Sequence, residues 1–63
     1  MFFGSDPARL ADRQLAAHEE RLAAYEGMRP VVKATGERRF IATLEAGIGH
    51  EREYIRFWKG LAP

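Results

Sequence analysis

Two neighbouring apolar stripes along residues 37–59 constrain the fold of this 63-residue chain more than any other feature of its sequence. One stripe consists of Ile41, Leu44, Ile48, Ile55 and Trp58, and the other of Phe40, Leu44, Gly47, Tyr54, Trp58 and Leu61. Both follow the period of an α-helix and share two residues, so the apolar face is wide. One facing helix cannot cover such a face, and a second polypeptide is expected against it.

A first helix is predicted from residue 7 to residue 26. Ser5 and Asp6 supply capping side chains before Pro7, whose fixed φ suits the first helical position. Apolar or weakly polar side chains then recur at spacings of three and four, while charged residues occupy the other positions. The apolar stripe of this first helix consists of Ala11, Leu15, His18, Leu22 and Tyr25, and Leu10 and Met28 widen it.

A loop is expected over residues 27–36, between the two helices. Gly27 is a typical helix end, and Pro30 disfavours helical geometry at Arg29. The second helix is then predicted over 37–59, with Thr35 as a candidate cap. The expected fold is all-α: a lead-in segment 1–6 and a helical hairpin of two long antiparallel helices, forming one domain over 1–63. Two hairpins would pair as a four-helix dimer.

Composition excludes several classes of protein. A chain of this length buries little apolar surface alone, and with no cysteine it has neither disulfides nor zinc–thiolate sites. Ten basic and nine acidic residues are interspersed, without the basic cluster of a nucleic-acid binder. The longest apolar run, Leu22–Tyr25, is far too short to cross a membrane, and the start "MFFG" does not resemble a signal peptide. A cytoplasmic protein is expected.

The segment "HEREY" differs by one residue from the His-Glu-x-x-His pattern of zinc hydrolases. Position 54 is tyrosine, so His50 lacks the second imidazole one turn away that a zinc site requires. Ser5 is the only serine and suits a cap, and the chain has no glycine-rich phosphate loop. The sequence therefore predicts no catalytic residue, no metal ligand, no cofactor and no enzymatic activity.

Several residues of the stripes have two interpretations. Gly47 lies on the apolar face, where a missing side chain permits close helix packing, whereas Gly49 points away from it. Glu51, also on the apolar face, either reaches water or an arginine such as Arg52 or Arg39 of a partner chain, or forms an inter-chain ion pair that fixes register. His18 is either a boundary residue bonded to a carbonyl or carboxylate, or a pH switch.

Aromatic side chains near the end of the second helix also have two interpretations. Tyr54, Phe57 and Trp58 could line a pocket for a flat organic ligand. Aromatic residues at helical spacing are more often part of a core, and the core interpretation is preferred.

Three segments in order resemble the C-terminal domain of PadR-type transcriptional regulators, also described as the virulence activator alpha C-terminal domain. These are "FFG" (Phe2, Phe3, Gly4), "HEERLAAYEGM", and "RRFIATLEAGIGHEREYIRFW" with Gly47, Ile48, His50, Glu51, Arg52 and Trp58. The resemblance covers nearly the whole chain. It implies a helical domain that mediates homodimerisation and, in some members, responds to effectors such as phenolic compounds. The winged-helix domain of the same regulator would be a further partner.

The leading hypothesis is thus a non-enzymatic homodimerisation domain of a PadR-type regulator that does not itself bind DNA, because the family's winged helix is not among these residues. One rival is an effector-sensing module that binds a flat aromatic ligand through Tyr54, Phe57 and Trp58. Another is a stand-alone adaptor that heterodimerises with a full-length regulator. The expected dimer interface consists of Leu15, Leu22, Tyr25, Ile41, Leu44, Gly47, Ile48, Glu51, Ile55 and Trp58.

Overall fold

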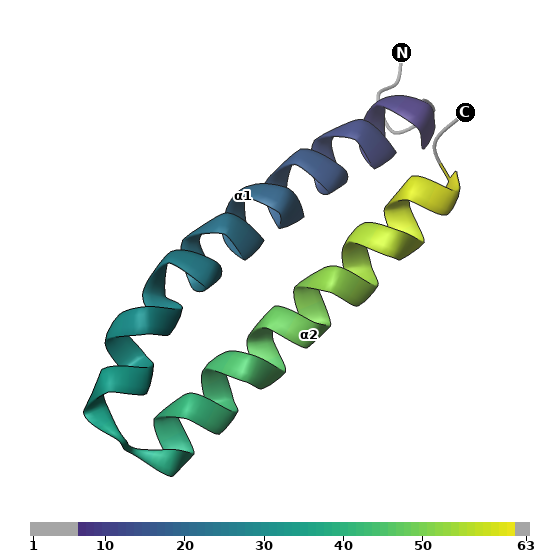
Figure 1. The fold of residues 1–63 in the computed structure, drawn as a ribbon. Helices are drawn as coiled ribbons and strands as arrows, with labels where there is room; N and C mark the ends of the chain where they lie inside the picture. Colours follow the sequence, from purple (N-terminus) through teal and green to yellow (C-terminus); the bar gives the residue numbers. More distant parts are fainter. Residues whose placement is uncertain (1–6, 62–63) are drawn as a thin grey trace.

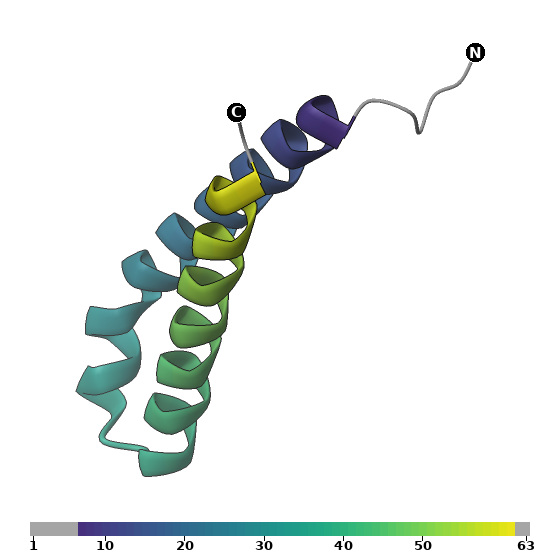
Figure 2. The same ribbon diagram turned by 90° about the vertical axis from the view of Figure 1, so that its right-hand side faces the viewer.

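A computed structural model describes residues 7–61 as two long helices joined by a tight turn. Helix α1 spans Pro7–Thr35 and helix α2 spans Arg38–Leu61. Figures 1 and 2 show the helices side by side along their length, with the turn at one end of the hairpin and residues 7 and 61 at the other. The predicted all-α hairpin of two antiparallel helices is confirmed. Residues 1–6, which include the predicted caps Ser5 and Asp6, lie outside the described residues.

The expected loop over 27–36 is wrong, because α1 continues for nine residues beyond Glu26. Gly27 does not end the helix: among the described residues only Gly36 has a positive φ, of 68°, which is the conformation of a C-terminal glycine cap. Pro30 lies inside α1 although it removes one backbone hydrogen bond, at a cost of about 3 kcal/mol. Packing between the helices compensates for this cost, because without residues 27–35 of α1 the first turns of α2 would have no helix beside them.

The turn is short because its polar groups bond to one another, to the last turn of α1 and to the first turn of α2. The Gly36 N–H donates to the Lys33 carbonyl at 3.1 Å, and the Thr35 hydroxyl donates to the Val32 carbonyl at 2.6 Å. The same hydroxyl accepts the Glu37 N–H at 3.1 Å. Thr35 thus closes the turn but is not the cap of the second helix that the sequence suggested, because Thr35 belongs to α1 and the N–H it accepts precedes α2. The Glu37 carbonyl then accepts the Ile41 N–H at 3.0 Å, which begins α2 at Arg38.

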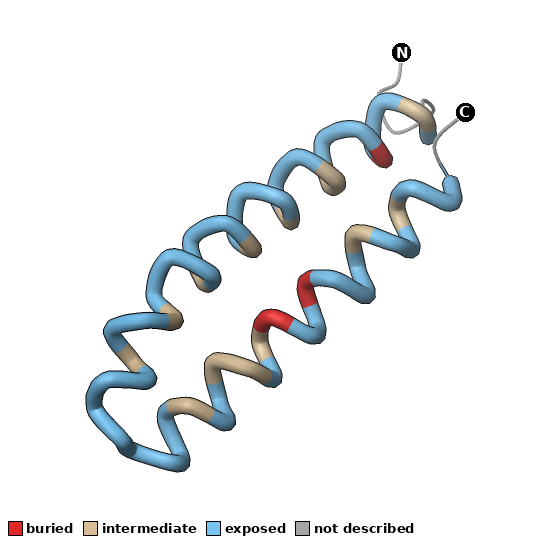
Figure 3. The backbone as a smooth tube through the Cα atoms, in the orientation of Figure 1, coloured by how far each residue is buried: buried red, intermediate tan, exposed pale blue. Residues whose placement is uncertain are grey.

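The contact between α1 and α2 is a single seam, and Figure 3 shows its buried and half-buried positions on the facing sides of the helices. We define the seam by two series at spacings of three and four: Ala11, Leu15, His18, Leu22, Tyr25, Arg29 and Val32 from α1, and Ile41, Leu44, Ile48, Glu51, Ile55 and Trp58 from α2. Of the described residues only Ala11, Ile48 and Glu51 are fully buried. Two helices alone therefore enclose almost no core.

The hairpin is a rod of 51 × 17 × 15 Å with a radius of gyration of 14.9 Å. A compact domain of this length would have a radius of gyration of about 11 Å. The accessible surface of this chain is 4909 Å², whereas a compact monomer of the same mass, 7.2 kDa, exposes about 4,100 Å². The chain thus exposes about 800 Å² more than a compact monomer, which equals the area that each partner contributes to a standard protein–protein interface.

Candidate interaction face

The hairpin has one apolar face, which is formed by a stripe of each helix. Both stripes lie one residue before the seam positions, which corresponds to a rotation of about 100° on an α-helix. Because the two helices run in opposite directions, this rotation brings both stripes to the same side of the hairpin. We call this surface the apolar face: Leu10, Gln14, Ala17, Arg21, Ala24, Met28 and Val31 of α1, and Phe40, Thr43, Gly47, His50, Tyr54, Phe57 and Leu61 of α2.

Large apolar side chains on this face are open to solvent. They are between 42% and 69% exposed, and every large apolar side chain that the described part of the chain exposes belongs to this face. The seven residues are Leu10, Met28, Val31, Phe40, Tyr54, Phe57 and Leu61. Large apolar side chains that are exposed together on one face mark a candidate interaction site.

The apolar side chains lie at the two ends of the face, and smaller or polar residues lie between them. At the open end of the hairpin, Tyr54 and Phe57 border a groove of about 670 Å³. At the turn end, Val31 and Phe40 are the most exposed apolar side chains, at 69% and 61%. The groove is lined by Gln14, His18, Arg21, Glu53, Tyr54, Phe57 and Trp58, which confirms that the stripes of α1 and α2 share one side.

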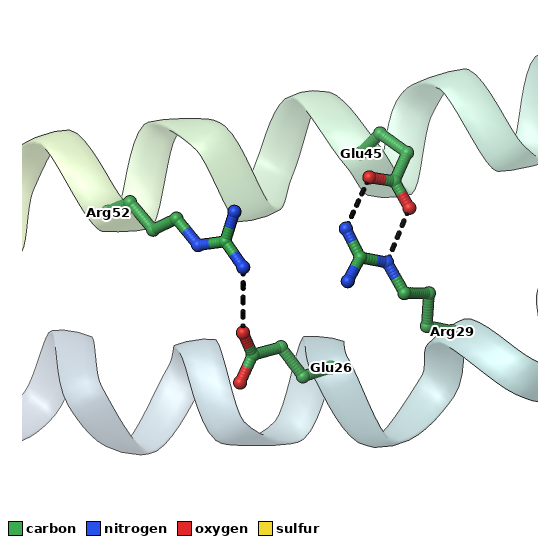
Figure 4. A network of polar contacts seen from close by, with 4 residues as sticks. All are labelled: Glu26, Arg29, Glu45 and Arg52. Carbon is green, nitrogen blue, oxygen red and sulfur yellow. Dashed lines mark hydrogen bonds and ion pairs between the residues drawn. The ribbon is translucent and has the colours of Figure 1, made fainter.

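The opposite side of the hairpin is charged. One position after the seam, the helices carry Asp12, Glu19, Glu26 and Lys33 on α1, and Glu45, Arg52, Arg56 and Lys59 on α2. Figure 4 shows two ion pairs that cross between the helices here. Arg29 donates to both Glu45 oxygens, at 2.7 and 2.6 Å, and Arg52 donates to Glu26 at 3.1 Å. Arg56 also pairs with Glu53 within α2.

The bidentate pair of Arg29 and Glu45 changes the ionisation of both groups. Its hydrogen bonds raise the pKa of the Arg29 guanidinium above its usual value, and they hold the pKa of the Glu45 carboxyl below its usual value. Both side chains remain about one-third exposed, so this pair fixes the relative position of the helices more than it stabilises them. The charged side therefore resembles an ordinary solvated helix surface.

Polar residues also lie within the seam, where Glu51 is only 6% exposed. His18 donates from Nδ1 to Glu51 Oε1 at 2.6 Å, and Arg21 donates to Oε2 at 3.4 Å. Burial alone would raise the pKa of the Glu51 carboxyl, but these two hydrogen bonds outweigh burial and lower its pKa. The His18 ring stacks on Tyr54, with centroids 4.9 Å apart, and so connects this cluster to the apolar face.

This geometry corrects the predicted role of Glu51. Its partners are His18 and Arg21 of the same chain rather than Arg52, Arg39 or an inter-chain cation. The prediction that His18 bonds a carboxylate is confirmed. The sequence could have suggested the pair, because His18 and Glu51 occupy seam positions at equal height in an antiparallel hairpin.

The residues predicted for the dimer interface lie mainly in the seam of one hairpin. Ile48, at 1% exposure, has no surface left for a partner. Half-buried positions leave only their edges available: Leu15, Leu22, Tyr25, Ile41, Leu44, Ile55 and Trp58. Gly47 belongs to the apolar face, as expected, and the Tyr25 ring lies against it. A Cβ at position 47 would meet Tyr25 Cε2 at 3.2 Å. The expected stripes were thus correct as a pattern, but the seam and the outer face were not separated.

The candidate ligand-contacting residues Tyr54, Phe57 and Trp58 do meet in the groove at the open end. Phe57 and Trp58 also form an edge-to-face pair, with ring centroids 5.0 Å apart. Over residues 7–61 no group of three acidic or histidine side chains is arranged to hold a metal ion. Neither α1 nor α2 has the length and apolar character needed to cross a membrane.

Comparison with protein-family models, curated proteins and solved structures gives no match for this chain. Function must therefore be inferred from the geometry of the hairpin and from the sequence resemblance described above.

Proposed function

We propose that this chain is a homodimerisation domain in which the apolar faces of two hairpins meet to form a four-helix bundle. The observation that carries this proposal is the apolar face itself. Seven large apolar side chains remain exposed, while only Ala11, Ile48 and Glu51 are buried among the described residues. A hairpin with so little enclosed core gains most of its stability from what covers that face.

A second copy is the occupant that we favour, and the surface of the chain is large enough for one. The excess surface of about 800 Å² per chain matches the contribution of one partner to a standard interface. In addition, both stripes of the face have the alternating three- and four-residue spacing that lets helices interlock along their whole length. A second copy carries the same spacing, and so its side chains fit between those of the first.

On the sequence resemblance alone, we extend the proposal to a PadR-type transcriptional regulator. The domain would join two winged-helix domains and hold them at the half-site spacing of a palindromic operator. It would be non-enzymatic, would not contact DNA itself, and would work in the cytoplasm. Phe2–Gly4 and the run from Gly47 to Trp58 support this assignment.

Sedimentation across a range of concentrations tests the dimer. We expect the wild-type chain to sediment as a dimer and its thermal midpoint to rise with concentration. Phe57→Glu removes two buried phenyl groups per dimer, at about 1.5–3 kcal/mol each. The substitution should raise the dissociation constant of the dimer at least about 100-fold. Ala42→Glu places the same charge on the opposite, charged side and should leave the dimer intact.

A wild-type chain that stays folded and monomeric at every concentration contradicts the proposal. So does a Phe57→Glu variant that dimerises as tightly as the Ala42→Glu control. Phe57→Leu keeps an apolar side chain at the position and should remain dimeric, which shows that the charge, and not the loss of the ring, disrupts the interface.

The groove favours one second candidate, an effector site for a flat aromatic molecule. Tyr54, Phe57 and Trp58 line it together with Arg21, which could pair with an anionic substituent. Titration with phenolic acids while Trp58 fluorescence is recorded tests this candidate. No change at millimolar ligand would leave dimerisation as the sole function of the face.

A further inference from the structure

We infer that the two hairpins pair with their long axes reversed, so that the turn end of each lies over the open end of the other. The inference rests on the proposed homodimer and specifies its geometry. In this arrangement the two-fold axis lies in the plane between the two apolar faces. It runs perpendicular to the helices and crosses them near the middle of their length. Helix α1 then packs on the partner's α1, and α2 packs on the partner's α2, in each case antiparallel.

The first argument is the uneven shape of the apolar face. Its depression lies at the open end, between Gln14, Tyr54 and Phe57. Its two most exposed apolar side chains, Val31 and Phe40, lie at the turn end. Reversal of the long axis brings these exposed side chains of each copy over the open end of the other, beside its groove. A two-fold axis along the hairpin would instead place groove on groove and these exposed side chains on those of the other copy.

The second argument is side-chain size along α2. The register that makes the two rods overlap fully places Tyr54 on the partner's Gly47, Phe57 on the partner's Thr43, and Leu61 on the partner's Phe40. Large side chains thus meet small ones at two of these three levels, which is how packed layers interlock. With the axis along the hairpin, Ala24 would lie beside the partner's Gly47, and four small residues would share one layer. A layer of four small residues would leave a void, and the residues around it would lose van der Waals contacts.

The centre of the face is the one place where this arrangement brings like charges together. Arg21 and His50 lie halfway along their helices, so each approaches its own copy near the axis. The charge of Arg21 is already opposed within its own chain by the buried Glu51 carboxylate, 3.4 Å away. Glu53, which lines the same groove as Arg21, is in turn paired with Arg56 of its own helix. The central layer is therefore close to electrically balanced.

Cysteine cross-linking distinguishes the two arrangements, because the chain has no cysteine of its own. His50→Cys should link to itself across the axis under mild oxidation. An equal mixture of Thr43→Cys and a tagged Phe57→Cys should give a mixed disulfide dimer. The matched mixture of Thr43→Cys and tagged Met28→Cys should give about tenfold less, since the rise per residue places those two positions about 21 Å apart between chains.

The opposite pattern would overturn the inference: strong linking of Thr43→Cys to Met28→Cys, weak linking to Phe57→Cys, and none for His50→Cys. Each variant is first sedimented to show that it is dimeric, so that a missing link reports geometry. A wild-type chain that is monomeric would overturn the proposed homodimer and this arrangement together. A dimer with the opposite cross-linking pattern would overturn the arrangement alone.

Discussion

Gly47 and Gly49 of α2 give a matched test of how closely the helices pack. Alanine is favoured over glycine within a helix by about 1 kcal/mol, and this gain is available at both positions. At Gly49, on the charged side, a new Cβ meets nothing within 4 Å. Gly49→Ala should therefore stabilise the fold by about 1 kcal/mol, which raises the melting temperature of a domain of this size by about 4–8 °C.

At Gly47 the same gain is opposed by a steric contact. The new Cβ would lie 3.2 Å from Tyr25 Cε2 and 3.5 Å from Cδ2, so the ring must move by a few tenths of an ångström. Tyr25 is half-buried in the seam, and adding a methyl group to a packed site costs about 1–3 kcal/mol. Gly47→Ala should be between neutral and destabilising by about 2 kcal/mol, which places it at least about 1 kcal/mol below Gly49→Ala.

Chemical denaturation at one fixed chain concentration measures both variants, because the stability of a dimer depends on concentration. A double-mutant cycle with Tyr25→Leu then measures how much of the difference is due to this ring, since Gly47→Ala should cost less once the ring is removed. Equal stabilisation by Gly47→Ala and Gly49→Ala would refute the close contact. An unchanged penalty in the Tyr25→Leu background would show that something other than this ring opposes the methyl group.

Two further predictions concern the continuation of α1 and the buried carboxylate. Pro30→Ala restores a hydrogen-bonding N–H within α1 and should raise the free energy of unfolding by up to about 3 kcal/mol, as measured by chemical denaturation. An unchanged or lower stability would indicate that residues 27–35 are not helical in solution. The pKa values of Glu45 and Glu51 lie below their ordinary value of 4.5, so the folded chain binds fewer protons than the unfolded chain in acid. Stability should be full above about pH 5 and should fall as the pH drops through and below 4.5, with a shallower fall in Glu51→Gln; a fall of equal steepness in that variant would exclude Glu51 as a source.

The sequence was sufficient to predict the hairpin, because each helix repeats its apolar positions at spacings of three and four. It was not sufficient to predict where α1 ends. Gly27 and Pro30 are local signals for a helix end, and they are overridden here by the need of α2 for a helix beside its first turns. Gly36, with its positive φ, carries the real signal. Two glycines nine residues apart look alike in sequence, and only the length of α2 distinguishes them.

The separation of seam and outer face was also beyond the sequence pattern alone. Two adjacent stripes on α2 show that the apolar surface is wide, but they do not show which stripe faces α1. The choice depends on α1, where Ala11, His18 and Tyr25 fix the height and rotation of the facing helix. Once His18 is placed opposite Glu51, Ile48 turns inward and Phe57 turns outward. Long-range pairing of this kind has no local signature.

The polar cluster in the seam connects the fold of one chain to the proposed dimer. An aliphatic pair in place of His18 and Glu51 would contribute at least as much stability, because polar groups taken from water gain little by bonding to each other. The cluster does discriminate against other registers. A slip of one heptad would move Glu51 away from His18 to the level of Ala11 or Tyr25, leaving a buried carboxylate without that hydrogen bond, at a cost of about 1–3 kcal/mol. Such a slip would also shift Tyr54 and Phe57 relative to α1 by about 10 Å and so remove the groove. The register that satisfies Glu51 within a chain is therefore the one that gives the apolar face its shape.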